Sequence, residues 1–74
     1  MSREIANRID YTVMCISSFA EKHSIPLQKS FLYLRQHGGL DFLKEFYDVE
    51  HLLSIDDAVN DLTMLCYRNG GELS

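Results

Sequence analysis

Apolar residues recur every three to four positions through nearly the whole chain, which is the spacing of helices that bury one face. The pattern breaks at Pro26, which has no amide hydrogen, and at the pairs Gly38-Gly39 and Gly70-Gly71, which suit helix C-caps. No segment alternates with period two for long enough to demand a strand. The sequence therefore predicts an all-α fold, a small bundle of three longer helices and one short helix.

The chain of 74 residues is short enough to predict a single helical domain over residues 1–74. Ser54, with Asp57 three residues later, predicts the N-cap of the last helix. The expected helices cover residues 3–22, 27–36, 41–47 and 55–68, and a connector covers residues 49–53.

The first predicted helix has apolar side chains on two faces. The stripe expected to face the core is Ile5, Ile9, Val13, Ile16 and Ala20. A second strip follows at positions i, i+3, i+4 and i+7, and it consists of Tyr11, Met14, Cys15 and Ser18. Either another element of the chain covers this strip, or a second copy or another protein binds it. We expect an apolar contact surface there, because tyrosine and methionine are enriched at interfaces.

The net charge of −4 is concentrated, because residues 45–61 contain six carboxylates and no lysine or arginine. Helix N-caps and solvent-facing positions account for carboxylates of this kind. The alternative is an acidic rim of a partner-binding surface, formed by Glu50, Asp57 and Asp61. His51 lies beside these residues in the sequence and is a further candidate, as a hydrogen-bonding or pH-responsive side chain.

The sequence contains no stretch of about 18 apolar residues and no secretory signal, so we expect a cytoplasmic protein without a membrane contact. Cys15 and Cys66 are then expected as free thiols. Neither CxxC nor HxxxH spacing occurs, and GxSxG is absent as well. We therefore expect no catalytic residue, no metal ligand and no cofactor.

Nucleic-acid binding is not expected, although helix, short turn and helix follow one another around Gly38-Gly39. The predicted helix after that turn and the residues that follow it contain Asp41, Glu45 and Asp48 against one Lys44. Phosphates would repel such a helix.

One long run, FLYLRQHGGLDFLKEFYDVEHLLSIDDAVNDL, has a distinctive arrangement of residues. The positions that carry it are Gly39, Asp41, Phe42, Leu43, Tyr47, Val49, His51, Asp57, Val59 and Leu62. In these positions the chain resembles a family of short bacterial helical proteins named domain of unknown function 3791, over about residues 9–67. That family has no established activity. Its members are often encoded next to ADP-ribosyltransferase-like proteins, so the resemblance implies an accessory or antitoxin-like role beside such a partner.

We therefore expect a non-enzymatic protein–protein interaction module that also self-associates. The candidate partner-binding residues are Tyr11, Met14, Cys15, Glu50, His51, Asp57 and Asp61. A small helical DNA-binding transcriptional regulator is the first alternative, and a metal-dependent enzyme is the second.

Overall fold

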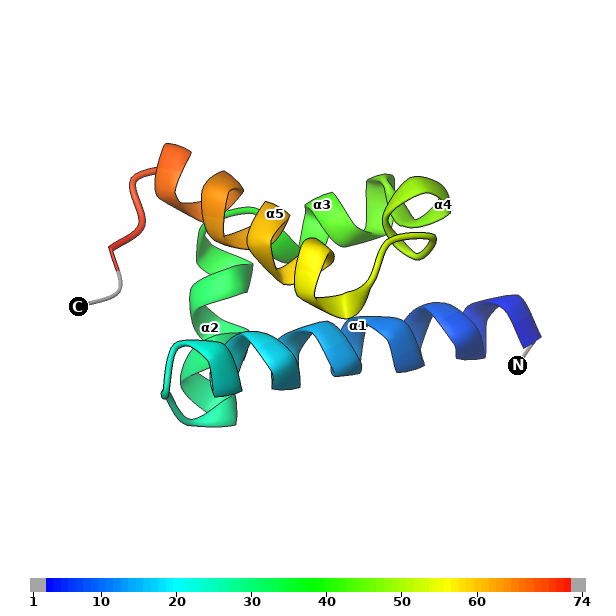
Figure 1. Cartoon of the computed structure of the whole chain (residues 1–74), viewed down its shortest axis with the longest axis horizontal. Helices are drawn as coiled ribbons and strands as arrows, with labels where there is room; N and C mark the ends of the chain where they lie inside the picture. The colour runs from blue at the N-terminus through cyan, green and yellow to red at the C-terminus, as the bar shows by residue number, and fades with distance from the viewer. Residues whose placement is uncertain (1–2, 73–74) are drawn as a thin grey trace.

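The computed structural model describes residues 3–72, and the side chains of residues 6–72, as five helices around one core (Figure 1). The helices are α1 (Arg3–Lys22), α2 (Leu27–Gln36), α3 (Gly39–Glu45), α4 (Tyr47–Glu50) and α5 (Ile55–Arg68). No strand occurs within residues 3–72. The all-α prediction is confirmed, and α1, α2 and α5 are the three longer helices.

Helix α1 extends along one side of the molecule, with α3, α4 and α5 above it and α2 closing one end (Figure 1). Pro26 precedes α2, as predicted, and the backbone N–H of Ser30 donates to its carbonyl. At the start of α5, the backbone N–H of Asp57 donates to Ser54 Oγ at 3.1 Å, which confirms the predicted N-cap. No helix of the described part of the chain is long and apolar enough to cross a bilayer.

The short third helix begins and ends two residues earlier than expected. Gly38 takes a left-handed conformation with φ of 80°, so α3 begins at once with Gly39. A Cβ atom on Gly39 would lie 2.9 Å from a methyl carbon of Leu34, so any other residue there would force the buried Leu34 side chain to shift. Phe46 then interrupts the helix, and α4 forms where the sequence predicted the end of a helix and the start of a connector.

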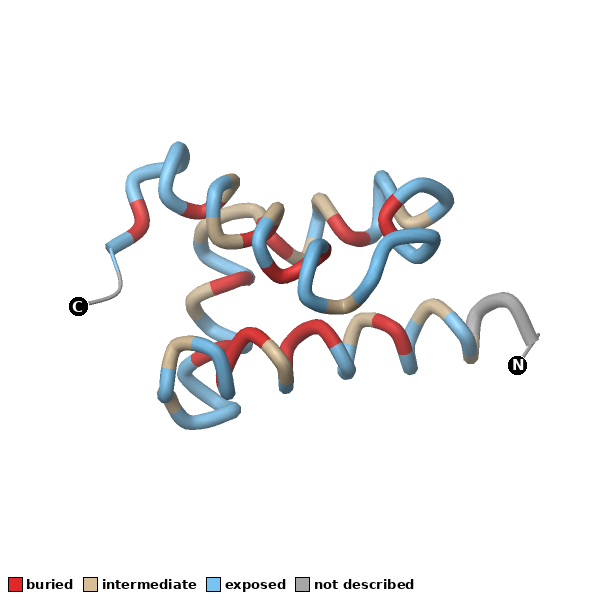
Figure 2. The backbone as a smooth tube through the Cα atoms, in the orientation of Figure 1, coloured by how far each residue is buried: buried red, intermediate tan, exposed pale blue. Residues whose placement is uncertain are grey.

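The core lies between α1 and α5 and is completed by single residues of α2 and α3 (Figure 2). Its largest fully buried side chains are Phe19, Leu34, Leu43 and Leu62. The buried hydrophobic residues are Tyr11, Cys15, Ile16, Phe19, Ala20, Leu34, Leu43, Ala58, Val59, Leu62 and Cys66.

The face of α1 that enters the core is not the predicted one. Tyr11 and Cys15, expected on an exposed strip, are buried at 9% and 0% exposure, whereas Ile9 and Val13 are 48% and 53% exposed. Ile16 and Ala20 are buried as predicted, and the side chain of Ile5 lies outside the described residues. The observed face places Tyr11 and Phe19 two turns apart on one side, and burying two aromatic rings removes more apolar surface than burying Ile9 and Val13.

Candidate functional site

A buried carboxyl group lies where α1, α4 and α5 meet. Phe46, with φ of −106° and ψ of 22°, ends α3, and its carbonyl accepts the backbone N–H of Glu50 at 2.8 Å. In the single turn that results, Tyr47 and Glu50 are three positions apart and share the inward face. The Glu50 side chain is therefore only 4% exposed, although glutamate is almost never fully buried without a partner.

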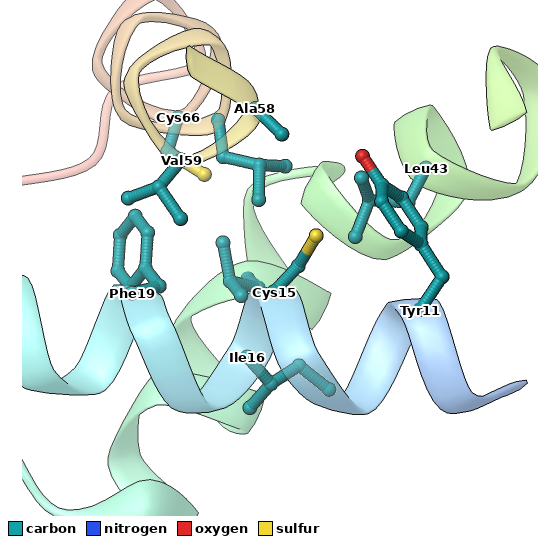
Figure 3. Close-up of a cluster of buried hydrophobic side chains, with 10 residues drawn as sticks. Tyr11, Cys15, Ile16, Phe19, Leu43, Ala58, Val59 and Cys66 are labelled. Carbon is teal, nitrogen blue, oxygen red and sulfur yellow. The ribbon is translucent and has the colours of Figure 1, made fainter. Parts of the chain in front are cut away.

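Glu50 faces side chains of two other helices. Its carboxyl group lies against that of Asp61 on α5, and Tyr11 and Cys15 on α1 are close enough to respond to its charge. Figure 3 shows the Tyr11 hydroxyl and the Cys15 sulfur directed from α1 into the interior between the helices. We refer to these four residues as the carboxyl cluster.

Burial and the neighbouring carboxyl group act together on Glu50. Loss of hydration disfavours its charged form, and Asp61 adds a hydrogen bond to the protonated form and repulsion of the ionised form. Together they raise the pKa of Glu50 to about 7. The protonated form of Glu50 therefore persists to a much higher pH than that of an exposed glutamate, and it can donate a hydrogen bond to Asp61.

The polar atoms of the cluster are incompletely paired. Within residues 6–72, neither the Tyr11 hydroxyl nor Glu50 Oε1 has a hydrogen-bond partner, although the Cys15 thiol lies beside that hydroxyl. Burial raises the pKa of Tyr11 and the pKa of Cys15, so both remain neutral at physiological pH. A buried unpaired polar group costs about 1–3 kcal/mol, so the cluster is a weak point in an otherwise apolar core.

Aromatic contacts support α4 from the side of α1. The Tyr11 ring meets the Tyr47 ring edge-on, with centroids 5.5 Å apart, and His51 stacks on Tyr47 at 4.5 Å. The guanidinium of Arg8 lies 4.8 Å from the centre of the Tyr47 ring and 3.8 Å from the exposed Asp48 carboxylate. Tyr47 is therefore the main apolar anchor of α4, and Glu50 is its polar anchor.

The structure brings four of the seven predicted site residues together in this cluster, in a different role from the expected one. Glu50 was expected on an acidic rim but is buried. Of the other predicted residues, Met14 is 52% exposed, and His51 and Asp57 lie on the surface. Sequence reasoning missed Tyr47, although its spacing of three and four from Glu50 and His51 is a helical-face signal.

A second feature is exposed rather than buried. Apolar and acidic side chains alternate irregularly over α4, its flanking residues and the start of α5, and Leu52 is the most exposed large hydrophobic residue within residues 6–72, at 77%. We call this the acidic apolar surface, and its exposed members are Glu45, Phe46, Asp48, Val49, Leu52, Leu53, Asp56 and Asp57.

The described part of the chain contains no cluster of side chains suited to binding a metal ion. No group of three or more His, Cys, Asp or Glu side chains could hold an ion there. The carboxyl cluster offers two carboxyl groups, a phenol and a thiol, enclosed among core residues. Its chemical capacity is to bind and release a proton.

A family model described as a protein of unknown function, DUF3791, matches residues 10–69. No curated protein and no solved structure matches the chain. The matched range contains all four residues of the carboxyl cluster and the whole acidic apolar surface. Since the match spans far more than half of its length, this chain belongs to the DUF3791 family of proteins of unknown function.

Proposed function

We propose that this chain is a non-enzymatic interaction module that binds a protein partner through the acidic apolar surface. The observation that carries the proposal is the exposure of Leu52, at 77%, among carboxylates. Val49 is 61% exposed and Phe46 is 45% exposed on the same short segment. Exposed apolar groups with a charged rim are typical of binding surfaces.

The charge of this surface indicates the chemistry of its partner. Residues 45–61 contain six carboxylates and no lysine or arginine. A complementary partner has an apolar groove bordered by lysine and arginine, and the opposite charges accelerate its association. An ADP-ribosyltransferase-like protein has to bind a phosphate-containing nucleotide, and an accessory module could cover a basic surface of that kind.

The carboxyl cluster supports a module rather than an enzyme. Tyr11, Cys15 and Glu50 are at most 9% exposed, so a substrate has no access to their reactive atoms. Cys15 and Cys66 are both buried free thiols, which suits a reducing compartment, and we propose that the module acts in the cytoplasm.

Site-specific photocrosslinking tests this function in cells that naturally make the chain. A benzoylphenylalanine at position 52 should give one discrete adduct, and the same group at the exposed Gln36 on α2 serves as the control. The charge-reversing pair Asp56→Lys and Asp57→Lys should remove the adduct. The captured protein, once purified, should bind the chain more weakly as salt concentration rises.

Three results would refute the proposal. An adduct of equal yield from position 36 would show that contact at position 52 is unspecific. An adduct consisting of two copies of this chain would identify self-association as the use of the surface. A captured protein with an acidic contact surface would contradict the expected charge complementarity.

A further inference from the structure

Helix α4 has one turn, so its inward side chains decide whether it stays in place. Tyr47 and Glu50 face inward, whereas Phe46, Val49 and Leu52 on either side and between them are exposed. A single helical turn is unstable by itself, because most of its backbone groups have no partner within the turn. Apart from the Phe46 ring on Phe42, with centroids 5.2 Å apart, and the exposed pair of Asp48 with Arg8, the inward contacts of this segment come from Tyr47 and Glu50.

The Glu50 contact exists in two forms that differ by one proton. With the proton, an uncharged acid group donates a hydrogen bond to Asp61, and its burial costs little. Without the proton, two carboxylates face each other in a poorly hydrated position, and both repulsion and lost hydration oppose contact. Outward movement of α4 would hydrate the Glu50 carboxylate. It would break only a few backbone hydrogen bonds.

We propose that Glu50 and Asp61 form a proton-controlled latch, which holds α4 against α1 and α5 while Glu50 is protonated and releases residues 46–53 when it ionises.

Among the side chains that the structure describes, the groups that act on Glu50 include no positively charged one. From α1, Tyr11 and Cys15 lie near it as neutral groups, and from α5, the Asp61 carboxyl group faces it. On its own element, Tyr47 packs beside Tyr11, and His51 directs Nδ1 to the Tyr47 carbonyl at 2.6 Å.

Two basic residues of the described chain lie near α4. Arg8 and Lys44 line the groove next to Tyr47, and neither is among the groups that act on Glu50 in the described structure. Within residues 6–72, no cation is among the groups that act on ionised Glu50 and could compensate its burial.

The direction of the pH effect follows from the pKa in each form. Glu50 has a pKa of about 7 when α4 is held, and its ordinary value is 4.5 when the carboxyl group is in water. The held form binds the proton more tightly, so acid favours holding. As pH rises from about 4.5 to 7, release becomes up to about tenfold more frequent per pH unit, and above that range the effect levels off.

Release would act on the surface proposed to bind a partner. It would detach the apolar side chains of residues 46–53 from the rest of the molecule. It would also add the Glu50 carboxylate to the acidic side chains of the surface. This consequence rests on the proposed function, whereas the latch itself is a property of the isolated chain. The two can therefore fail separately, because crosslinking at position 52 tests partner binding and titration of Glu50 tests the latch.

Nuclear magnetic resonance of the full chain between pH 4 and 9 provides the test. The ¹³C shift of the Glu50 carboxyl group should titrate near neutral pH. Hydrogen-exchange protection factors of the Glu50 and His51 amides, which bond to Phe46 and Tyr47, should fall by about tenfold or more over the same range. The Leu62 amide, inside α5, should keep its protection.

Glu50→Gln keeps the size and hydrogen-bonding capacity of the protonated acid, so protection of α4 should become independent of pH. Glu45→Gln is the matched control on the exposed side, and it should behave like the unmodified chain. An ordinary acidic titration of Glu50 would overturn the latch. So would an unchanged pH response in Glu50→Gln, or an equal loss of protection at Leu62. The titration of the unmodified chain decides the matter even if Glu50→Gln does not fold.

Discussion

Two buried polar side chains, Ser30 and Glu50, lie where helices meet, and they differ in whether their polar atoms are hydrogen-bonded. Ser30 on α2 is 0% exposed, and its hydroxyl donates to the Ile16 carbonyl of α1 at 2.8 Å. Glu50 on α4 is 4% exposed, yet Oε1 has no partner within residues 6–72. The α1–α2 joint is therefore paired at every pH, whereas the corner at α4 depends on a proton.

The apolar neighbours of the two joints reinforce this difference. Next to Ser30, the ring of Phe19 is fully buried and stacks on Tyr33 with centroids 5.7 Å apart. Around α4, Val49 and Leu52 are mostly exposed, and the Tyr47 ring packs edge-on against Tyr11 of α1. The comparison indicates that the α1–α2 joint contributes mainly to the stability of the fold, whereas the position of α4 depends on pH.

The largest expected effect is at the α1–α2 joint. Phe19→Ala should lower the free energy of unfolding by about 3–5 kcal/mol, because a buried ring leaves a cavity, and this is a large part of the stability of a chain this small. Phe46→Ala, at a side chain 45% exposed, should cost about 1 kcal/mol. Urea denaturation followed by circular dichroism measures both. Equal losses would remove the contrast between the two regions.

Next in size is the response of the α4 corner to pH. Below pH 4.5, Glu50 is protonated in both folded and unfolded chains, so Glu50→Gln should match the unmodified protein. Between pH 4.5 and about 7, the folded state holds the proton more tightly, and the stability of the unmodified chain should fall. Above pH 7, Glu50→Gln should be more stable by about 1–3 kcal/mol, as measured by urea denaturation across this range. A constant difference at every pH would contradict this.

A comparable loss without pH dependence is expected at Ser30. Ser30→Ala removes the hydroxyl that donates to Ile16 and should lower stability by about 1 kcal/mol at both pH 4.5 and pH 8. Thermal unfolding at the two pH values, with Ser17→Ala on the exposed side of α1 as control, measures this loss. A loss confined to one pH would show that this joint also responds to protons.

The smallest effect is predicted for Tyr11→Phe, which keeps the ring against Tyr47 and removes a hydroxyl without a hydrogen-bond partner in the described structure. Stability should change by less than about 1 kcal/mol, and an increase is the expected sign. Tyr33→Phe is a useful comparison in the other region. A loss of about 2 kcal/mol or more for Tyr11→Phe would reveal a hydrogen bond that the carboxyl cluster depends on.

Sequence patterns correctly predicted the position of those helices whose ends are marked by a proline or a capping residue. Pro26 and the Ser54 cap determine where α2 and α5 begin through local backbone chemistry, which a sequence displays directly. Four of the predicted site residues do meet in space, but the predicted reason for their importance was wrong for Tyr11, Cys15 and Glu50. Each was assigned to a surface and each is buried.

The errors have one physical origin, because they concern which face of an element meets its neighbours. Helix α1 has two apolar faces that both adjoin Ile16, and only packing against α5 decides that Cys15 is buried and Val13 is exposed. Glu50 was placed on the surface because of its residue type. Its burial follows from the break at Phe46, which starts a new turn and directs Glu50 inward.

The two cysteines have a practical consequence, because each region contains one. Cys15 lies beside Glu50, whereas Cys66 lies near Tyr33, and both are inaccessible at 0% exposure. Burial raises the pKa of Cys66 to about 11 and that of Cys15 above its ordinary value, so alkylating reagents can attack either sulfur only after the surrounding helices separate. The rate at which each cysteine is alkylated therefore reports how often the helices around it separate. Mass spectrometry of the alkylated peptides can measure the two rates separately without any engineered label.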